Sequence, residues 1–177
     1  CSMTLRAPST LLFSRISLAT LLVLGGALGC RKPKTKVDKL KGISATELLL
    51  ESEIALKQGK YDEGRKLLRY IEENLPSSVE FPKAKLMLGD SYFFATGASY
   101  PEALVEYTSF INFFPRHEQR DYALYHVALC HYATIETAER DQTETRKALD
   151  TFKQLLQEAP GSPYAPDATA KVTQCWR

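Results

Sequence analysis

Three prolines, Pro76, Pro115 and Pro160, each close a segment of the same design, and this repeat most constrains how the chain can fold. A small residue stands twelve positions before each proline, and large apolar residues follow it after four and seven positions. The segments carry Gly64-Leu68-Ile71, Ala103-Tyr107-Phe110 and Ala148-Phe152-Leu155 at these places. Such spacings put side chains on one face of an α-helix, and a helix usually ends before a proline. The chain is therefore predicted to be a helical repeat protein.

The repeat continues beyond each proline, where an alanine follows eight positions later, at Ala84, Ala123 and Ala168. Each unit is therefore predicted as a pair of helices. The helices are expected at about residues 44–58, 62–74, 82–95, 101–114, 118–135 and 143–158, with a seventh starting near residue 163. The proline spacings of 39 and 45 residues are close to the period of about 34 residues in tetratricopeptide repeats. The predicted fold is all-α, a tetratricopeptide-like solenoid of helical hairpins with about three and a half repeats.

This pattern divides the chain into three predicted parts. Residues 1–29 are expected to be a signal peptide, residues 30–43 a tether that begins with a lipidated cysteine, and residues 44–177 the repeat domain. Within the repeat domain the pairs are expected at residues 44–76, 82–115 and 118–160, followed by a partial fourth at 163–177. No single pair can bury its apolar surface alone, so stacking between neighbours is expected to form the core.

The N-terminal segment has the features of an export signal. Arg6 and Arg15 precede an apolar run of thirteen residues, Ile16–Leu28, which is shorter than the ~20 residues that span a bilayer. The run ends in Ala27-Leu28-Gly29-Cys30, which resembles the bacterial lipobox, although ordinary signal peptidase could also cut such a site. We expect Cys30 to be lipidated. Because Arg31 rather than aspartate follows it, the lipoprotein-sorting pattern favours the outer membrane.

The charge distribution favours a tethered protein over a nucleic-acid-binding one. The segment Arg31–Lys41 (RKPKTKVDKLK) is rich in lysine, and we expect a solvated tether, in which contact with anionic lipid head groups is a further possibility. Arg6 and Arg15 are the only charged side chains before Cys30, and the rest of the chain has 21 basic and 21 acidic side chains. A neutral domain of this kind argues against non-specific nucleic-acid binding.

The sequence contains no pattern that indicates catalysis. It has no glycine-rich phosphate loop, no Cys-x-x-Cys motif and no nucleophile elbow, so we expect no enzyme activity, no cofactor and no metal. His126 and His131 are five residues apart, about 140° around a helix, and are expected to be structural. Cys130 and Cys175 occupy equivalent places in successive repeats, where helices lie about 8–10 Å apart. Because a disulfide needs shorter Cα separations, we expect two separate thiols.

The first helices of the pairs are expected to form an inner face that could bind a partner. In the repeat register this face carries Leu49, Glu53, Leu56, Leu86, Asp90, Phe93, Tyr122, Tyr125, Leu129 and Tyr132. Aromatic rings on such a face suit an extended peptide with aromatic side chains. The predicted peptide- or partner-binding residues are Leu49, Leu86, Phe93, Tyr122, Tyr125 and Tyr132. The alternative is that these rings only pack neighbouring repeats together.

Several segments resemble a known family. These are Gly59-Lys60-Tyr61, Tyr122-Ala123-Leu124-Tyr125, the loop Arg140-Asp141-Gln142-Thr143 and the stretch from Pro160 to Ala168 (PGSPYAPDA). Together with the lipobox-like cysteine and the basic tether, they resemble the BamD family, the lipoprotein subunits of the outer-membrane β-barrel assembly machinery. The resemblance covers about residues 44–176. Members of that family have five helix pairs, so it implies that the fifth pair and half of the fourth lie beyond this chain.

The resemblance also implies a function. It implies a non-enzymatic scaffold on the periplasmic face of the outer membrane, anchored by lipid, which helps to recognise and insert β-barrel proteins. The implied partners are the β-barrel assembly subunit, the other lipoproteins of the complex and unfolded outer-membrane protein precursors, which the family's N-terminal half is proposed to contact through their C-terminal signal. The alternative is a periplasmic tetratricopeptide adaptor that acts in cell division or pilus assembly.

Overall fold

The computed structural model describes residues 40–135 and 142–175, which form seven α-helices and, within those ranges, no β-strand. The helices are α1 (Ala45–Lys57), α2 (Tyr61–Asn74), α3 (Phe81–Phe93), α4 (Tyr100–Phe113), α5 (Arg120–Ile135), α6 (Gln142–Glu158) and α7 (Ala165–Cys175). The predicted all-α class is confirmed, and the helix boundaries lie within about two residues of the expected ones. The predicted signal peptide, Cys30 and the tether up to residue 39 lie outside the described residues, as do Trp176 and the side chain of Cys175.

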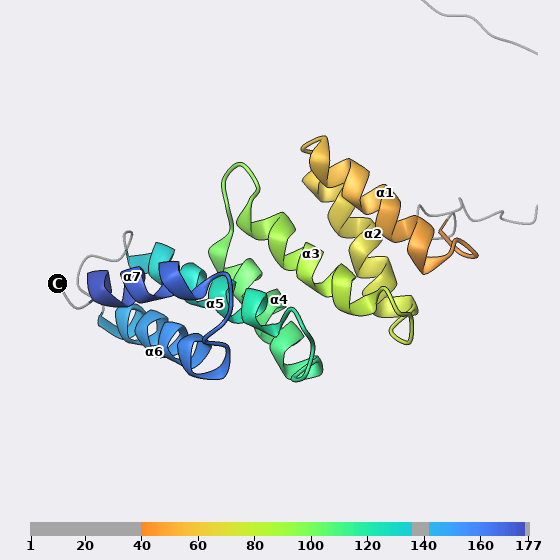
Figure 1. Cartoon of the computed structure of the whole chain (residues 1–177). Helices are drawn as coiled ribbons and strands as arrows, with labels where there is room; N and C mark the ends of the chain where they lie inside the picture. The colour runs from red at the N-terminus through yellow and green to blue at the C-terminus, as the bar shows by residue number, and fades with distance from the viewer. Residues whose placement is uncertain (1–39, 136–141, 176–177) are drawn as a thin grey trace, which may run out of the picture. The chain divides into compact units, whose positions relative to one another are not determined.

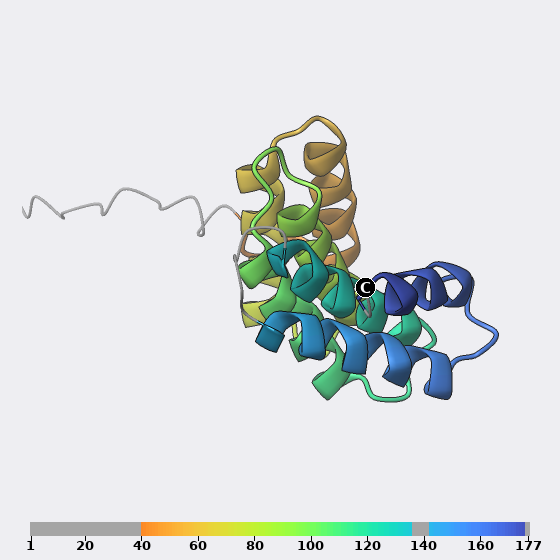
Figure 2. The same ribbon diagram turned by 90° about the vertical axis from the view of Figure 1, so that its left-hand side faces the viewer.

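Successive helices pack against one another as hairpins. The seven described helices belong to one compact unit of the chain. Within that unit each helix contacts the next one, from α1 on α2 to α6 on α7, and α1 also contacts α3 (Figures 1 and 2). This arrangement is the tetratricopeptide-like solenoid that the repeated prolines predict.

Local sequence signals explain where the helices begin and turn. Ser44 caps α1, and its hydroxyl oxygen accepts a hydrogen bond from the backbone N–H of Glu47 over 3.2 Å. Pro82 and Pro101 stand in the first turns of α3 and α4, where a missing N–H costs nothing. Gly59, between α1 and α2, has a φ of 73°, a left-handed conformation that glycine adopts without steric cost.

Small residues allow close contact between helices, as the repeat pattern predicts. A Cβ atom on Gly64 would lie 2.7 Å from Cδ2 of Leu56, and one on Gly89 would lie 2.7 Å from Cε1 of Tyr107. Both distances are shorter than van der Waals contact, so a larger residue at either place would force its neighbour aside. Ala103 and Ala148, which occupy the place of Gly64 in the later repeats, have no exposed surface.

The core consists of three hydrophobic clusters, each shared by consecutive helix pairs. The first includes Leu48, Leu68, Ile71, Ala84 and Leu88; the second includes Leu86, Ala103, Tyr107, Phe110 and Ala123; the third includes Leu124, Ala128, Phe152, Leu155 and Ala168. Each cluster contains residues on both sides of one of the repeat prolines. Stacking therefore buries the apolar faces, as expected for a solenoid.

A buried ion-pair network joins α2, α3 and α4. Lys85 is only 4% exposed, and its Nζ lies 2.5 Å from Oε1 of Glu72 and 2.9 Å from Oε2 of Glu106. The other oxygen of Glu106 accepts a hydrogen bond from Nη2 of Arg69 over 3.0 Å. The network therefore satisfies two buried charged groups with opposite charges from neighbouring helices.

No described helix is both long enough and apolar enough to cross a membrane.

Candidate functional site

The structure places the six predicted binding residues in two different environments. Leu49 is 8% exposed and Leu86 is 4% exposed, and both belong to hydrophobic clusters of the core. Both therefore offer little surface to a partner. The other four, Phe93, Tyr122, Tyr125 and Tyr132, are half-buried and keep part of their rings accessible. The register assigns all six to one face, but it does not predict how deeply each side chain is packed.

The accessible rings are joined by a tyrosine that the repeat register did not include. Tyr164 lies in the turn before α7, and its ring stacks on that of Tyr125 with a centroid distance of 4.9 Å and an interplanar angle of 18°. The same ring meets Tyr122 edge-on at 5.8 Å. We call this set the aromatic strip, which consists of Phe93, Tyr122, Tyr125, Tyr132 and Tyr164. Tyr164 stands four residues after Pro160, and the earlier repeats have the polar residues Glu80 and Gln119 at this place. This difference between the repeats was the sequence signal that could have identified Tyr164 as a candidate.

Asp90 anchors the aromatic strip through hydrogen bonds. Its Oδ1 accepts from the hydroxyl groups of Tyr107 and Tyr122, each over 2.6 Å. Burial raises the pKa of the Asp90 carboxyl, and the two tyrosine hydroxyls oppose that rise. Burial, together with the neighbouring Asp90 carboxylate, also raises the pKa of both phenols, so they remain hydrogen-bond donors. The position of the ring of Tyr122 is thereby fixed from below.

His126 fills the space beneath the aromatic strip and is 4% exposed. Its ring centroid lies 4.1 Å from that of Tyr122 and 5.1 Å from that of Phe93. Its Nδ1 lies 3.0 Å from the backbone oxygen of Tyr122, which can only accept, so Nδ1 carries the hydrogen. Burial lowers the pKa of this imidazole, and the nearby Asp90 carboxylate partly opposes that effect. His126 therefore has the structural role that the sequence predicts.

The distal end of the aromatic strip is tied to α7. The hydroxyl of Tyr125 donates to Oδ2 of Asp167 over 2.7 Å, and that of Tyr132 donates to Oε1 of Gln174 over 3.0 Å. Nζ of Lys171 lies 4.5 Å from the ring centroid of Tyr132, a cation–π contact. These bonds orient the two rings relative to the last described helix.

The remaining candidate residues have structural contacts. His131 Nδ1 lies 2.6 Å from Oε2 of Glu144, and its ring is separated from His126 by more than a helical turn along α5. Cys130 is a free, buried thiol, and burial raises its pKa to about 12, so it is not a reactive nucleophile. Within residues 40–135 and 142–175 no three histidine, cysteine, aspartate or glutamate side chains gather in a way that could hold a metal.

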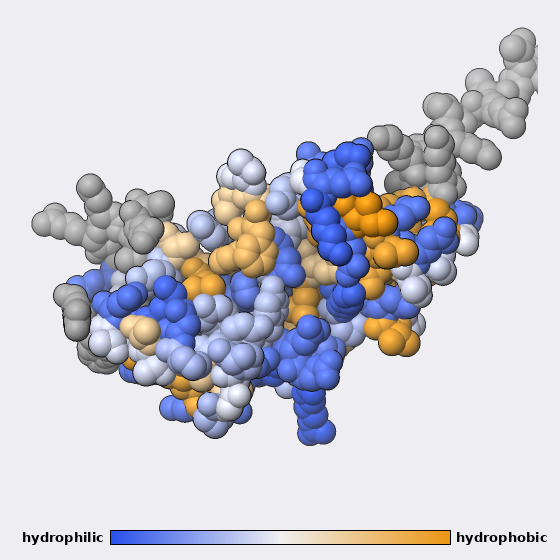
Figure 3. All heavy atoms as spheres, turned by 45° about the horizontal axis from the view of Figure 1, so that its top comes forward, coloured by the Kyte–Doolittle hydropathy of each residue, from blue (hydrophilic) through white to orange (hydrophobic). Residues whose placement is uncertain are grey.

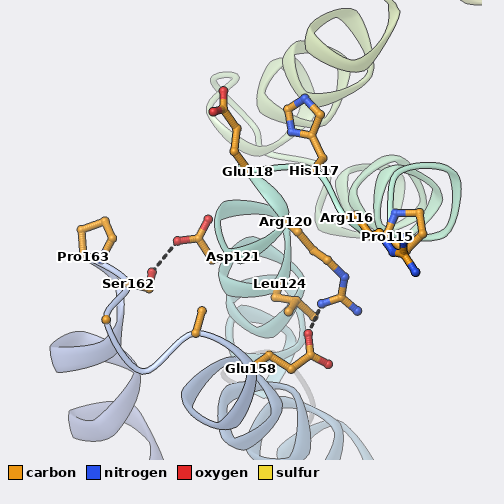
Figure 4. A pocket seen from close by; sticks show the side chains of 12 residues that line it. Pro115, Arg116, His117, Glu118, Arg120, Asp121, Leu124, Glu158, Ser162 and Pro163 are labelled. Atoms are coloured by element: carbon orange, nitrogen blue, oxygen red, sulfur yellow. Dashed lines mark hydrogen bonds and ion pairs between the residues drawn. The ribbon is translucent and has the colours of Figure 1, made fainter.

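A surface pocket of about 540 Å³ lies beside the aromatic strip, between the α4–α5 turn and the α6–α7 turn (Figure 4). Its lining includes Leu124 and Pro163 together with charged residues. Ser162 donates to Oδ2 of Asp121 over 2.7 Å, and Arg120 pairs with Glu158 across the pocket. These contacts hold the two turns together.

The outer side of α1 carries exposed apolar residues. Leu50 is 58% exposed and Ile54 is 48% exposed, one helical turn apart. Figure 3 shows hydrophobic side chains gathered over α1 among hydrophilic neighbours. Exposed aliphatic residues of this kind are ordinary on a protein surface and do not by themselves define a site.

Comparison with known proteins identifies one family. Residues 42–175 match the sequence model of the family described as YfiO: Outer membrane lipoprotein. Among curated relatives, a protein of Rickettsia prowazekii is 33% identical over 156 residues, which are 88% of this chain and 61% of that protein. A protein of Haemophilus influenzae is 30% identical over 166 residues, 88% of this chain and 62% of the relative. The corresponding protein of Caulobacter vibrioides is 28% identical over 158 residues, 89% of this chain and 51% of the relative.

All three relatives are named outer membrane protein assembly factor BamD. The chain spans about half to three-fifths of the length of these curated relatives. The matched region, residues 42–175, includes every described helix. The similarity therefore extends over the whole aromatic strip.

Proposed function

The chain belongs to the YfiO family of outer membrane lipoproteins, and from this membership we propose that it serves as a non-enzymatic scaffold in the assembly of outer-membrane β-barrel proteins. The observation that carries the proposal is the family match over residues 42–175, together with relatives named as assembly factors. A stack of helical hairpins suits this role, because such proteins bind partners through an extended surface. We propose lipid attachment at Cys30 and a location on the periplasmic face of the outer membrane.

The proposed partners are the β-barrel assembly subunit, the other lipoproteins of the complex and unfolded outer-membrane protein precursors. The full chain, solubilised from membranes in detergent, should copurify with the β-barrel subunit, which mass spectrometry would identify. Recovery of only cell-division or pilus-assembly proteins would instead favour the alternative of a periplasmic adaptor.

We propose that the aromatic strip is the part that contacts precursors. Half-buried tyrosine and phenylalanine rings with fixed orientations can bury an aromatic side chain of a peptide at low entropic cost. Burying one such ring is worth roughly 1.5–3 kcal/mol, and a few of them can support micromolar binding after ordering costs. The peptide class that fits best is an extended segment ending in an aromatic residue.

The residues of the aromatic strip differ in how many packing contacts they make. Substitutions at different strip residues can therefore separate an effect on stability from an effect on peptide binding. Phe93 packs on Tyr100 and Tyr107 as well as on His126, so Phe93→Ala should lower the melting temperature. Tyr125 stacks on Tyr164, donates to Asp167 and also meets His126 and Phe152, but its side chain is half-buried. Tyr125→Ala should therefore weaken binding of a barrel C-terminal peptide and leave the helical circular-dichroism spectrum intact. Phe113→Ala is the matched control, because Phe113 is 64% exposed on α4, which carries no strip residue.

Fluorescence titration of a labelled peptide against each variant, beside a thermal melt, distinguishes the two possible roles of the rings. If Tyr125→Ala leaves the dissociation constant unchanged while the melting point falls, the aromatic strip is only packing between repeats.

A further inference from the structure

Three carboxylates beside the aromatic strip have no basic partner. Asp90 accepts from two tyrosine hydroxyls, Asp167 accepts from the hydroxyl of Tyr125, and Asp121 accepts from Ser162 and from a backbone N–H. Within the two described ranges no lysine or arginine side chain lies within ion-pair distance of any of the three. Their negative charge is therefore not balanced by a direct contact in the folded chain.

Some carboxylates elsewhere in the described region do have a basic partner. Glu53 pairs with Lys83, Asp62 with Arg65, Glu144 with Lys147, Glu158 with Arg120, and Glu72 and Glu106 with Lys85. Six carboxylates on the remaining surfaces thus have a lysine or arginine partner, whereas the three beside the strip have none. Exposed carboxylates such as Glu51, Glu73 and Asp150 also have no ion pair within the described residues. What is particular to the surface that α3, α5 and α7 form is that Asp90 and Asp167 accept hydrogen bonds from tyrosines of the aromatic strip.

The three carboxylates and the rings make one continuous surface. Asp90 holds Tyr122, the ring of Tyr122 meets that of Tyr164, and Tyr164 stacks on Tyr125, which in turn holds Asp167. Asp121 lies close enough to Tyr164 that its charge, together with that of Asp90, raises the pKa of this phenol beyond the effect of burial. A ligand that covers the rings of Tyr122, Tyr164 and Tyr125 would therefore lie beside carboxylates that hydrogen-bond to these rings.

Some tyrosine rings of the protein already hold a cation. Nζ of Lys171 lies over Tyr132, and the guanidinium carbon of Arg65 lies 4.7 Å from the ring centroid of Tyr92. In the part of the chain that the structure describes, Tyr122, Tyr125 and Tyr164 have no such cation. The rings that border these carboxylates are therefore open to a cation from a ligand.

We propose that the aromatic strip selects peptide segments that carry a lysine or arginine beside their aromatic residue. This inference rests on the peptide-binding role proposed above and names the chemistry of the peptide. The aliphatic stem of the basic side chain would lie on the tyrosine rings, and its charged end would lie among Asp90, Asp121 and Asp167. Charge complementarity of this kind adds specificity and accelerates association more than it adds affinity.

The test uses the full chain, purified in detergent, and three fluorescein-labelled peptides that end in phenylalanine. One peptide has a lysine near that end, and the matched peptides have glutamine or glutamate in its place. Fluorescence anisotropy gives each dissociation constant at low and at high sodium chloride. The lysine peptide should bind about threefold to tenfold more tightly than the glutamine peptide at low salt. The glutamate peptide should bind most weakly, and added salt should reduce the differences.

Two conservative variants locate the effect. Asp121→Asn combined with Asp167→Asn removes both charges and keeps side chains that can accept hydrogen bonds, so the ratio of the affinities for the lysine and glutamine peptides should fall toward one. Asp150→Asn is the matched control, because Asp150 is exposed on α6, which carries no strip residue. It should leave all three affinities unchanged.

The outcomes distinguish this inference from the proposed function. Equal binding of the lysine and glutamine peptides, with binding still lost in Tyr125→Ala, would overturn the inference and leave the peptide-binding role in place. An equal effect of Asp150→Asn would also overturn it, because the preference would then arise from net charge. If none of the peptides binds the unaltered chain, both the inference and the peptide-binding role fail.

Discussion

At the scale of single residues, small side chains decide how closely the helices pack. Ala103 and Ala148 have no exposed surface, and each belongs to a hydrophobic cluster shared by neighbouring repeats. Replacing either with leucine should overpack the helix contact and lower the free energy of unfolding by about 1–3 kcal/mol. Urea denaturation followed by circular dichroism measures this loss.

Thr108→Leu is the control for these substitutions, because Thr108 is exposed on α4 and should tolerate leucine within about 0.5 kcal/mol. A urea midpoint that both alanine substitutions leave in place would contradict the helix register described above.

His126 makes the stability of the fold depend on pH. Burial keeps its pKa below the ordinary value of 6.5, so the folded chain holds this imidazole neutral while the unfolded chain takes up a proton more readily. The stabilisation is therefore present above pH 6.5 and is lost as the pH falls through the depressed pKa of the folded state. The titratable groups that face it are Asp90, Tyr107, Tyr122 and Tyr125.

We expect the urea midpoint of the unaltered protein to fall between about pH 7.5 and pH 5.5 more steeply than that of His126→Gln. His117→Gln, in the α4–α5 turn, should keep the steeper dependence of the unaltered protein. Parallel pH profiles for the unaltered protein and His126→Gln would show that the pKa of His126 is the same in the folded and unfolded states.

At the scale of helices, the buried network around Lys85 fixes how α2, α3 and α4 meet. Lys85→Ala should destabilise the fold by about 3 kcal/mol, because it leaves two glutamates facing each other with only Arg69 to balance them. Lys83→Ala removes an ion pair with Glu53 in which the lysine is 56% exposed, and it should cost less than about 1 kcal/mol. Equal losses in urea denaturation would mean that the Lys85 network contributes no more than a surface pair.

The helices could be predicted from the sequence because their signals are local. The prolines and the small residues that precede them recur at fixed distances, and those distances depend only on helix geometry. The Lys85 network could not be predicted in the same way. In the segment Lys83-Ala84-Lys85 both lysines look exposed, and only the approach of Glu72 and Glu106 from other helices makes the burial of Lys85 favourable.

The candidate site could be predicted only in part, because helical periodicity specifies the face of a helix but not the depth of burial. Helical periodicity assigned Phe93, Tyr122, Tyr125 and Tyr132 to one face, and in the structure the four side chains are half-buried. Periodicity did not separate them from Leu49 and Leu86, because burial depends on the neighbouring helix rather than on the register. It also left out Tyr164, which precedes α7 and reaches the strip only through the turn after Pro160.

At the scale of the whole molecule, the question is what keeps the repeat domain near its membrane. Cys30 is the proposed attachment point, and the segment from Arg31 to Lys41 that follows it is rich in lysine. One acyl chain binds a bilayer only marginally, so several chains or added electrostatic attraction must contribute. A basic residue near an anionic surface adds about 1 kcal/mol to membrane binding. Several such residues lie between Arg31 and Lys41, so we expect them to strengthen the attachment.

Cys30→Ala should therefore abolish incorporation of labelled palmitate and move the protein to the soluble periplasmic fraction, or leave it with its signal uncut. The chain offers a matched control in Cys130→Ala, since Cys130 is a buried thiol of the repeat domain and its loss should affect stability without changing the membrane fraction. A further variant with glutamine at the tether lysines tests the electrostatic contribution, because it should release more protein as the salt concentration rises. If Cys30→Ala is processed and fractionates like the unaltered protein, attachment at this cysteine is wrong, and the repeat domain must reach the membrane through its protein partners alone.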